Sequence, residues 1–339
     1  MKISLVLTTI NKVSKNILKI SKETKKNNWN FIVVGDKSTP KNFKIKFCDF
    51  YNINDQKKLN FKFSKICSQN TYARKNIGYL IAIKKGSDVI YETDDDNYPK
   101  IGFFDKLNLF HTVKELKGSN WVNIYLNFIK KKINIWPRGL PLQYIYNKTI
   151  FKYKKIHSKF YLQQGICDGD PDVDAVYRLT NQKINIRFRN KIKFSLGKCL
   201  SPSNSQNTIW FKKIFPLMYL PVTCTMRATD IWRGLIALMI LRKDRKKILF
   251  FGTSMYQNRN QHNLIKDFEQ EVCLYINNTK MIDLIKKIKL KSGENNYFYN
   301  LRKIYGVLIN KKYFLRTEKL FLNAWIEDCK TLTSYKKIT

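Results

Sequence analysis

The chain has 339 residues and a formal net charge of +39, with 64 Lys and Arg residues against 25 Asp and Glu residues. Hydrophobic residues make up 44% of it, which is enough for a large core, while the late apolar run Leu235–Leu241 is far shorter than the roughly 20 residues needed to span a bilayer. Seven cysteines without a CxxC pair argue against a disulfide framework or a zinc knuckle and fit a reducing, cytoplasmic compartment.

The first hundred residues alternate between apolar, β-branched runs and amphipathic segments. Each apolar run ends in polar or turn-forming residues, and Gly86 marks the end of the second helix. The expected elements are strands at 3–7, 29–34 and 87–93 and helices at 14–25 and 71–85. This alternation predicts an α/β fold with a parallel sheet, which binds ligands at the carboxyl ends of its strands.

The rest of the chain is less regular. Residues 121–207 are expected to form loops and short strands, 230–241 a helix, and 264–339 mostly helix. We therefore divide the chain into a nucleotide-sugar-binding domain at 1–270 and a helical C-terminal appendage at 271–339.

An acidic run follows the third expected strand. Asp94, Asp95 and Asp96 are adjacent, and neighbouring carboxylates repel one another unless a cation or hydrogen-bond donors offset their charge. Mg²⁺ and Mn²⁺ prefer oxygen ligands and can bridge a carboxylate to a diphosphate. We predict a Mn²⁺ or Mg²⁺ site with Asp96 as the first ligand, Asp94 on the metal or the ribose, and Asp95 beside the nucleotide sugar. A solvated acidic loop is the alternative.

Basic residues precede this strand on its neighbouring helix. Arg74, Lys75 and Asn76 would approach a diphosphate at the same strand ends, with an ordinary basic helix face as the alternative. Gly78 would let the helix pack closely against the sheet. The candidates for nucleoside contact at the ends of the first two strands are Thr8, Thr9, Asp36 and Lys37. Plain turn chemistry is the alternative for the aspartate.

Later carboxylates are candidates for sugar or acceptor binding. Pro171 and the lack of a closing Glu argue against an EF-hand in the alternating acidic loop. That loop supplies Asp168, Asp170, Asp172 and Asp174.

A helix start and a polar loop follow further along the chain. Asp230 is a candidate general base or a helix N-cap, and Trp232 and Arg233 are candidates for sugar or acceptor contact. His262 lies in a polar loop and is a third candidate metal ligand or a solvent-exposed side chain.

In their order and spacing, the first strand, the Arg74 helix and the acidic run resemble the opening of GT-A glycosyltransferases with their DxD motif. Longer blocks are similar to the STELLO family of glycosyltransferase-like proteins up to about Glu271: residues 33–40, 92–97, 136–142, 165–180 and 230–233. Plant members of that family are Golgi membrane proteins associated with cellulose synthesis. We recognise no transmembrane anchor in this sequence, so Golgi residence is not expected.

A more distant likeness is to reversibly glycosylated polypeptides, which include UDP-arabinopyranose mutases. Residues 138–141 are similar to the segment that carries their glycosylated arginine. The resemblance implies that Arg138 lies near the anomeric carbon of the donor as a catalytic residue, either glycosylated or holding a phosphate or sugar.

We expect a metal-dependent glycosyltransferase of polysaccharide biosynthesis that takes a UDP-sugar and a glycan or lipid-linked acceptor. The alternatives are a mutase or self-glycosylating protein that uses the same site, and a scaffold with a decayed site. The basic charge also suits nucleic acid or peripheral contact with an anionic inner-membrane surface. Codon-driven drift of solvated lysines is favoured, however, and without a recognisable module we expect no specific nucleic-acid partner.

Overall fold

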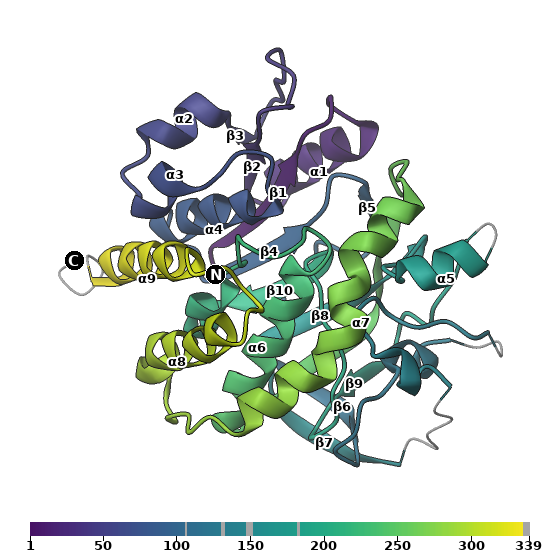
Figure 1. The fold of residues 1–339 in the computed structure, drawn as a ribbon. Helices are drawn as coiled ribbons and strands as arrows, with labels where there is room; N and C mark the ends of the chain where they lie inside the picture. The colour runs from purple at the N-terminus through teal and green to yellow at the C-terminus, as the bar shows by residue number, and fades with distance from the viewer. Residues whose placement is uncertain (106, 130–132, 147–151, 182–183, 335–339) are drawn as a thin grey trace.

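The computed structural model describes residues 1–105, 107–129, 133–146, 152–181 and 184–334. Its centre is an 11-stranded mixed sheet in the order β3-β2-β1-β4-β10-β8-β11-β9-β6-β7, with β5 paired to β11 (Figure 1). The strands are β1 Ile3–Thr9, β2 Asn30–Gly35, β3 Asp49–Tyr51, β4 Val89–Thr93, β5 Asn97–Pro99, β6 Phe110–Leu116, β7 Tyr153–Lys159, β8 Leu162–Gly169, β9 Lys193–Ser195, β10 Asn207–Phe211 and β11 Ile248–Gln257. The mixed α/β architecture with C-terminal helices is of the GT-A type and confirms the expected fold class.

Helices surround this sheet. They are α1 Lys15–Lys26, α2 Ile53–Lys58, α3 Lys62–Ile66, α4 Lys75–Lys84, α5 Ala175–Thr180, α6 Thr229–Lys243, α7 Leu264–Lys286, α8 Tyr297–Asn310 and α9 Glu318–Ser334. Among the described helices, none is long and apolar enough to cross a membrane.

The direction of the central strands brings distant parts of the sequence to one edge. Strands β1, β2 and β4 are mutually parallel, and β10 runs antiparallel between β4 and β8. Strand β8 therefore points the same way as β4, and β11 is parallel to β8. The polar residues that follow β1, β2, β4, β8 and β11 consequently gather at a single edge of the sheet, where open α/β sheets bind ligands.

Helix α4, which begins with the basic residue next to Arg74, packs closely against the sheet near this edge. A Cβ added at Gly78 would lie 2.6 Å from Val6 Cγ1 and 3.0 Å from Val34 Cγ2. Only glycine allows the helix to sit this close to β1 and β2, as the sequence predicts. Helix α4 follows a short 3₁₀ turn, η1 Tyr72–Arg74, and Gly86 beyond its end has a positive φ of 83°.

The C-terminal helices join the main core. Helix α9 packs against α3, α4 and α8, and buried Trp325 and Leu301 belong to the same hydrophobic cluster as Val6 of the sheet. The expected boundary at residues 270/271 falls inside α7. The division into two folding units stays a prediction.

Two acidic side chains of α9 hold other segments by backbone hydrogen bonds. Buried Glu318 accepts from the N–H groups of Val222 (3.1 Å) and Thr223 (2.7 Å). Asp328 accepts from the N–H groups of Lys62 and Phe63, each at 2.8 Å. The last described helix thus ties down both the start of α3 and the segment that leads into α6.

Candidate functional site

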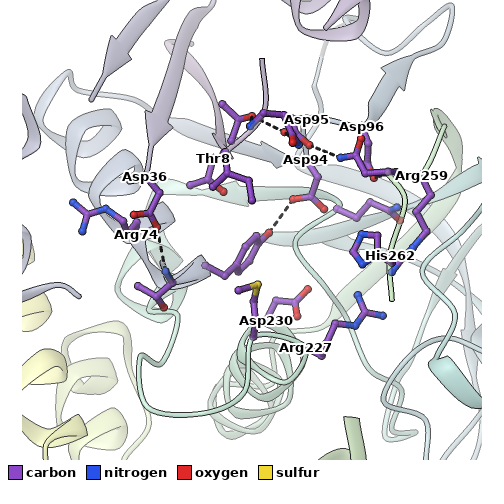
Figure 2. A pocket seen from close by; sticks show the side chains of 18 of the residues that line it. Thr8, Asp36, Arg74, Asp94, Asp95, Asp96, Arg227, Asp230, Arg259 and His262 are labelled. Atoms are coloured by element: carbon purple, nitrogen blue, oxygen red, sulfur yellow. Dashed lines mark hydrogen bonds between the residues drawn. The ribbon is translucent and has the colours of Figure 1, made fainter. Parts of the chain in front are cut away.

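A pocket of about 580 Å³ lies at the carboxyl edge of the sheet. Its wall comes from the ends of β1, β2, β4 and β11, the η1 turn, and the start of α6. Figure 2 shows Asp36 and Arg74 at one end of the pocket, Arg259, His262 and Arg227 at the other, and Asp94 between them. The predicted site residues that line it are Thr8, Thr9, Asp36, Arg74, Asp94, Asp95, Asp96, Arg138, Asp172, Asp230 and His262.

The three adjacent aspartates have different environments. Asp95 is bound within the protein, because it accepts from Thr9 Oγ1 at 2.5 Å, Asn11 Nδ2 at 2.9 Å and Asn260 Nδ2 at 3.2 Å. Asp94 accepts through Oδ1 from the Tyr72 hydroxyl at 2.9 Å and from buried Lys75 Nζ at 3.1 Å. Burial nevertheless raises the pKa of Asp94 above its ordinary value.

Asp96 fits a divalent cation best. Its Oδ2 accepts from Gln257 Nε2 at 2.9 Å, but its buried Oδ1 has no hydrogen-bond partner. Burial and the neighbouring negative charge of Asp94 raise the pKa of Asp96 to about 6. No group of three or more His, Cys, Asp or Glu side chains in the described ranges is arranged around a common metal position. A donor set of one or two carboxylates still suits Mg²⁺, which takes its remaining ligands from water and substrate phosphates.

The Asp36 end of the pocket is built on backbone contacts. Asp36 accepts from the N–H groups of Lys37 at 2.7 Å, Asn70 at 2.9 Å and Thr71 at 3.1 Å, so it fixes the loop that leads into η1. Arg74 is buried and donates only to neutral oxygens, including Gln56 Oε1 at 2.9 Å. Its guanidinium has no carboxylate partner among the described residues, but Figure 2 shows it on the far side of Asp36 from the acidic run.

Arg138 is enclosed by two carboxylates. Its Nε and Nη2 each donate to Asp172 at 2.8 Å, and its Nη1 and Nη2 each donate to Asp230 at 3.0 Å. A further N–H donates to the carbonyl of Arg227, so all five guanidinium donors are used. These ion pairs raise the pKa of Arg138 and lower the pKa of Asp230 and Asp172. The arginine is thereby held as a cation with no free N–H.

The pocket is locally negative although the chain is strongly basic. Its lining includes six carboxylates, Asp36, Asp94, Asp95, Asp96, Asp172 and Asp230, and four arginines, Arg74, Arg138, Arg227 and Arg259. A diphosphate brought here alone would meet an excess of negative charge at close range.

Sequence comparisons relate the chain to known proteins. A model of the family described as STELLO glycosyltransferases matches residues 227–338. The chain is 26% identical over 326 residues to the probable glycosyltransferase STELLO2 of Arabidopsis thaliana and 24% identical over 322 residues to STELLO1 of the same plant. The chain is a relative of the STELLO glycosyltransferases. Each match covers 88% of this chain and 41% of the plant protein, so the chain spans less than half the length of these relatives.

The family match reaches further than the sequence blocks indicated. It runs past Glu271, where the expected resemblance ended, and includes the whole of helices α7, α8 and α9. The C-terminal helices therefore belong to the family's own sequence pattern.

Several predicted site residues of this protein do not line the pocket. They are Lys37, Lys75, Asn76, Asp168, Asp170, Asp174, Trp232 and Arg233. Asn76 donates to the backbone carbonyl of Leu220 at 2.8 Å, and Asp168 accepts from Lys100 Nζ at 2.5 Å. Asp174 caps α5 and accepts from the Trp136 indole at 2.7 Å. Asp170 lies in an adjoining pocket.

Trp232 and Arg233 are buried in the core of this protein. The indole of Trp232 donates to Asn278 Oδ1 at 2.9 Å, and its exposure is 2%. Arg233 forms a bidentate pair with Glu92, with distances of 2.8 and 2.7 Å, and its guanidinium lies 4.9 Å from the Trp210 ring centre. Both side chains act through packing and ion pairing at these positions, and neither reaches the pocket.

Sequence reasoning missed several side chains that line the pocket. Arg227 pairs with buried Glu271 at 2.6 Å, and Arg259 pairs with Asp267 at 3.3 Å. Tyr72 bridges Asp94 and Ser205, and Gln257 holds Asp96. The only available signal was proximity in sequence, because Arg227 precedes Asp230 by three residues and Arg259 precedes His262 by three.

Proposed function

We propose that this protein is a metal-dependent glycosyltransferase that transfers a sugar from a nucleotide sugar, with UDP as the carrier, to a hydroxyl acceptor. The observation that carries the proposal is the buried, unpartnered oxygen of Asp96 in a net-negative pocket at the strand ends. An oxygen without a donor, surrounded by further carboxylates, matches a cation better than it matches an anion.

Asp96 and Asp94 would hold the divalent ion, with His262 on the same side of the pocket as a further candidate ligand. When bound, the ion supplies Lewis-acid neutralisation of charge on the departing diphosphate. Lys75 orients Asp94 through its contact at 3.1 Å and opposes the rise in the pKa of Asp94 that burial causes. Arg74 has no carboxylate partner among the described residues, and from its place behind Asp36 it would add positive charge near the phosphates without contacting them.

The nucleoside is proposed to lie at the end of the pocket formed by Asp36 and the loop of Asn70 and Thr71. The hydrogen bonds from that loop to Asp36 hold the walls rigid before the donor binds. Thr8 lines the same part of the pocket, and Thr9 is engaged with Asp95. Preorganised walls of this kind reduce the entropy lost on binding.

Asp230 remains our proposed base for the acceptor hydroxyl. Its carboxylate lines the pocket, and Arg138 keeps it ionised at neutral pH by lowering its pKa. A carboxylate with a low pKa accepts a proton weakly, so the base role requires that the contact with Arg138 loosens when substrate binds. Asp172 would keep Arg138 in place during that change.

The self-glycosylating and mutase alternatives depend on Arg138 as a nucleophile. Its five donors are all used and its pKa is raised, so the neutral guanidine that would attack an anomeric carbon is strongly disfavoured. We therefore assign Arg138 a positioning role in the proposed transfer.

The decisive experiment is calorimetric titration of UDP into the protein with Mn²⁺ and with a chelator. We expect UDP binding that requires the ion, and a loss of at least about tenfold in affinity for Asp96→Asn. Asp283→Asn removes an exposed carboxylate of α7 and should bind like the parent protein. UDP binding of equal strength with chelator would refute the metal dependence, and no binding of UDP under either condition would refute the donor assignment.

A further inference from the structure

A second, smaller pocket of about 270 Å³ adjoins the main one. The two share Arg259, Asn260 and His262 in their linings. The second pocket is completed by α5 and the segments beside it, through Asp170, Arg178, Asn181, Ile184 and Leu264. A ligand that occupies this space therefore lies directly beside whatever fills the main pocket.

Two buried arginines line the second pocket, and each keeps an unused donor. The side chains of Arg178 and Arg259 are 4% and 8% exposed, and the Nε of each is buried with no hydrogen-bond partner. Arg178 pairs with Asp170 at 2.5 Å, while the contact of Arg259 with Asp267 is longer, at 3.3 Å. Buried guanidinium donors without acceptors are costly and are satisfied by an incoming oxygen anion.

The linings of the two pockets differ in charge, and the second pocket stays the less negative one when Asp267, the partner of Arg259, is counted with it. The second pocket has two arginines and one carboxylate in its lining, whereas carboxylates outnumber arginines in the main pocket. Burial and the like charges of Arg227 and Arg178 lower the pKa of Arg259 to about 10, which an anion between these groups would reverse. An anionic group is thus better placed in the second pocket than anywhere in the main one.

The position of the second pocket indicates which substrate supplies the anion. Arg259 and His262 lie across the main pocket from Asp36, at the end away from the proposed nucleoside position (Figure 2). A donor that extends from Asp36 past the acidic run would point its sugar toward this end. The acceptor must approach from there.

We propose that the second pocket binds a phosphate or carboxylate group of the acceptor, and that this enzyme therefore acts on an anionic acceptor. The inference rests on the proposed function, because it takes the main pocket as the donor site. Arg178 and Arg259 hold the anionic group, and Asn181 and Asn260 complete the neutral part of the lining.

The test is calorimetric titration of two probes into protein saturated with UDP and Mg²⁺. Glycerol 3-phosphate represents a phosphate-bearing acceptor and glucuronate a carboxylate-bearing one. Arg178→Gln removes a buried charge that lines only the second pocket, and Asn181→Asp adds a negative charge at an exposed position of its lining. The matched controls are Arg187→Gln and Asn185→Asp, which make the same changes at exposed residues outside both pockets.

We expect at least one probe to bind beside UDP, and both pocket variants to weaken it about tenfold while the controls change it less than about twofold. The probe that binds more tightly identifies phosphate or carboxylate as the preferred group. UDP affinity should be the same in all variants, so a failure of UDP binding would speak against the donor site and not against this pocket. The proposal is overturned if neither probe binds, if pocket and control variants behave alike, or if the probes and UDP exclude one another.

Discussion

Replacing Asp96 by asparagine should raise the free energy of unfolding of the protein without ligand and weaken its ion-dependent binding of UDP. Asp96 is 8% exposed, and the pKa of its carboxyl group is raised from 3.8 to about 6 by burial and by Asp94. A shift of about two units corresponds to about 3 kcal/mol of destabilisation in the ionised form. The amide that replaces the unpartnered Oδ1 also lacks an acceptor, which costs about 1–2 kcal/mol. We therefore expect Asp96→Asn to be more stable by about 1–2 kcal/mol at pH 8.

The pH dependence of this difference follows from the direction of the pKa shift. A carboxyl group whose pKa is raised on folding binds its proton more strongly in the folded state, so the penalty is complete above about pH 6 and disappears as the pH falls toward 3.8. Urea unfolding of both proteins in chelator at pH 8 and pH 4.5 measures the difference directly. It should be clear at pH 8 and small at pH 4.5.

Two results would refute this reasoning. A destabilised Asp96→Asn protein at pH 8 would mean that the carboxylate is well satisfied without an ion. A stability gain of the same size at both pH values would show that the gain does not come from removing an ionised carboxylate. Asp283→Asn, which alters an exposed carboxylate, should show neither the gain nor the loss of UDP binding.

Three further predictions concern the frame and the chemistry of the site. Glu92→Gln leaves buried Arg233 without its charge partner and should cost about 3–5 kcal/mol in urea unfolding, whereas Glu327→Gln, at an exposed pair with Lys62, should leave the unfolding curve unchanged. Gly78→Ala should lower the free energy of unfolding by about 1–3 kcal/mol through overpacking against Val6. Gly306→Ala, in open space on α8, should raise it by up to about 1 kcal/mol. Equal effects of the two substitutions would contradict the close approach of α4. Asp230→Asn should lower kcat by at least about 100-fold, and a pH–rate profile that keeps its acidic limb in this variant would reassign Asp230 to positioning Arg138.

The first half of the sheet was predictable because its sequence is locally consistent. β1, β2 and β4 are apolar runs that end in polar residues, and each was expected to within two residues of its observed bounds. The acidic run after β4 could be assigned to the strand ends for the same reason. Parallel strands place their carboxyl ends together whatever their separation in sequence.

The second half was harder to predict because polar residues occupy buried strands. β8 contains Gln163 and Gln164, which are nearly fully buried and satisfied by hydrogen bonds to segments far along the chain. Neither an alternating nor a continuous apolar pattern marks this strand. The residues predicted for sugar binding suffered from the same problem, since nothing in the local sequence distinguishes Asp172 in the pocket from Asp174 at a helix cap.

The pocket's arginines depended on contacts that only the folded chain supplies. Arg227 and Arg259 stand among 64 basic residues, and their partners Glu271 and Asp267 belong to α7. The carboxylates that orient Arg227 and Arg259 come from a distant helix, and pairing over such a separation produces no periodic pattern in the sequence.

The carboxylate of Glu318 has a consequence for any shortened version of this protein. It accepts hydrogen bonds from the backbone N–H groups of residues 222 and 223, a few positions before Arg227 and Asp230. A chain cut after α7 would lose Glu318, and with it the hydrogen bonds that hold the segment leading into α6. We expect such a fragment to have a loosened wall on the acceptor side, even where the strands that carry the aspartates remain folded.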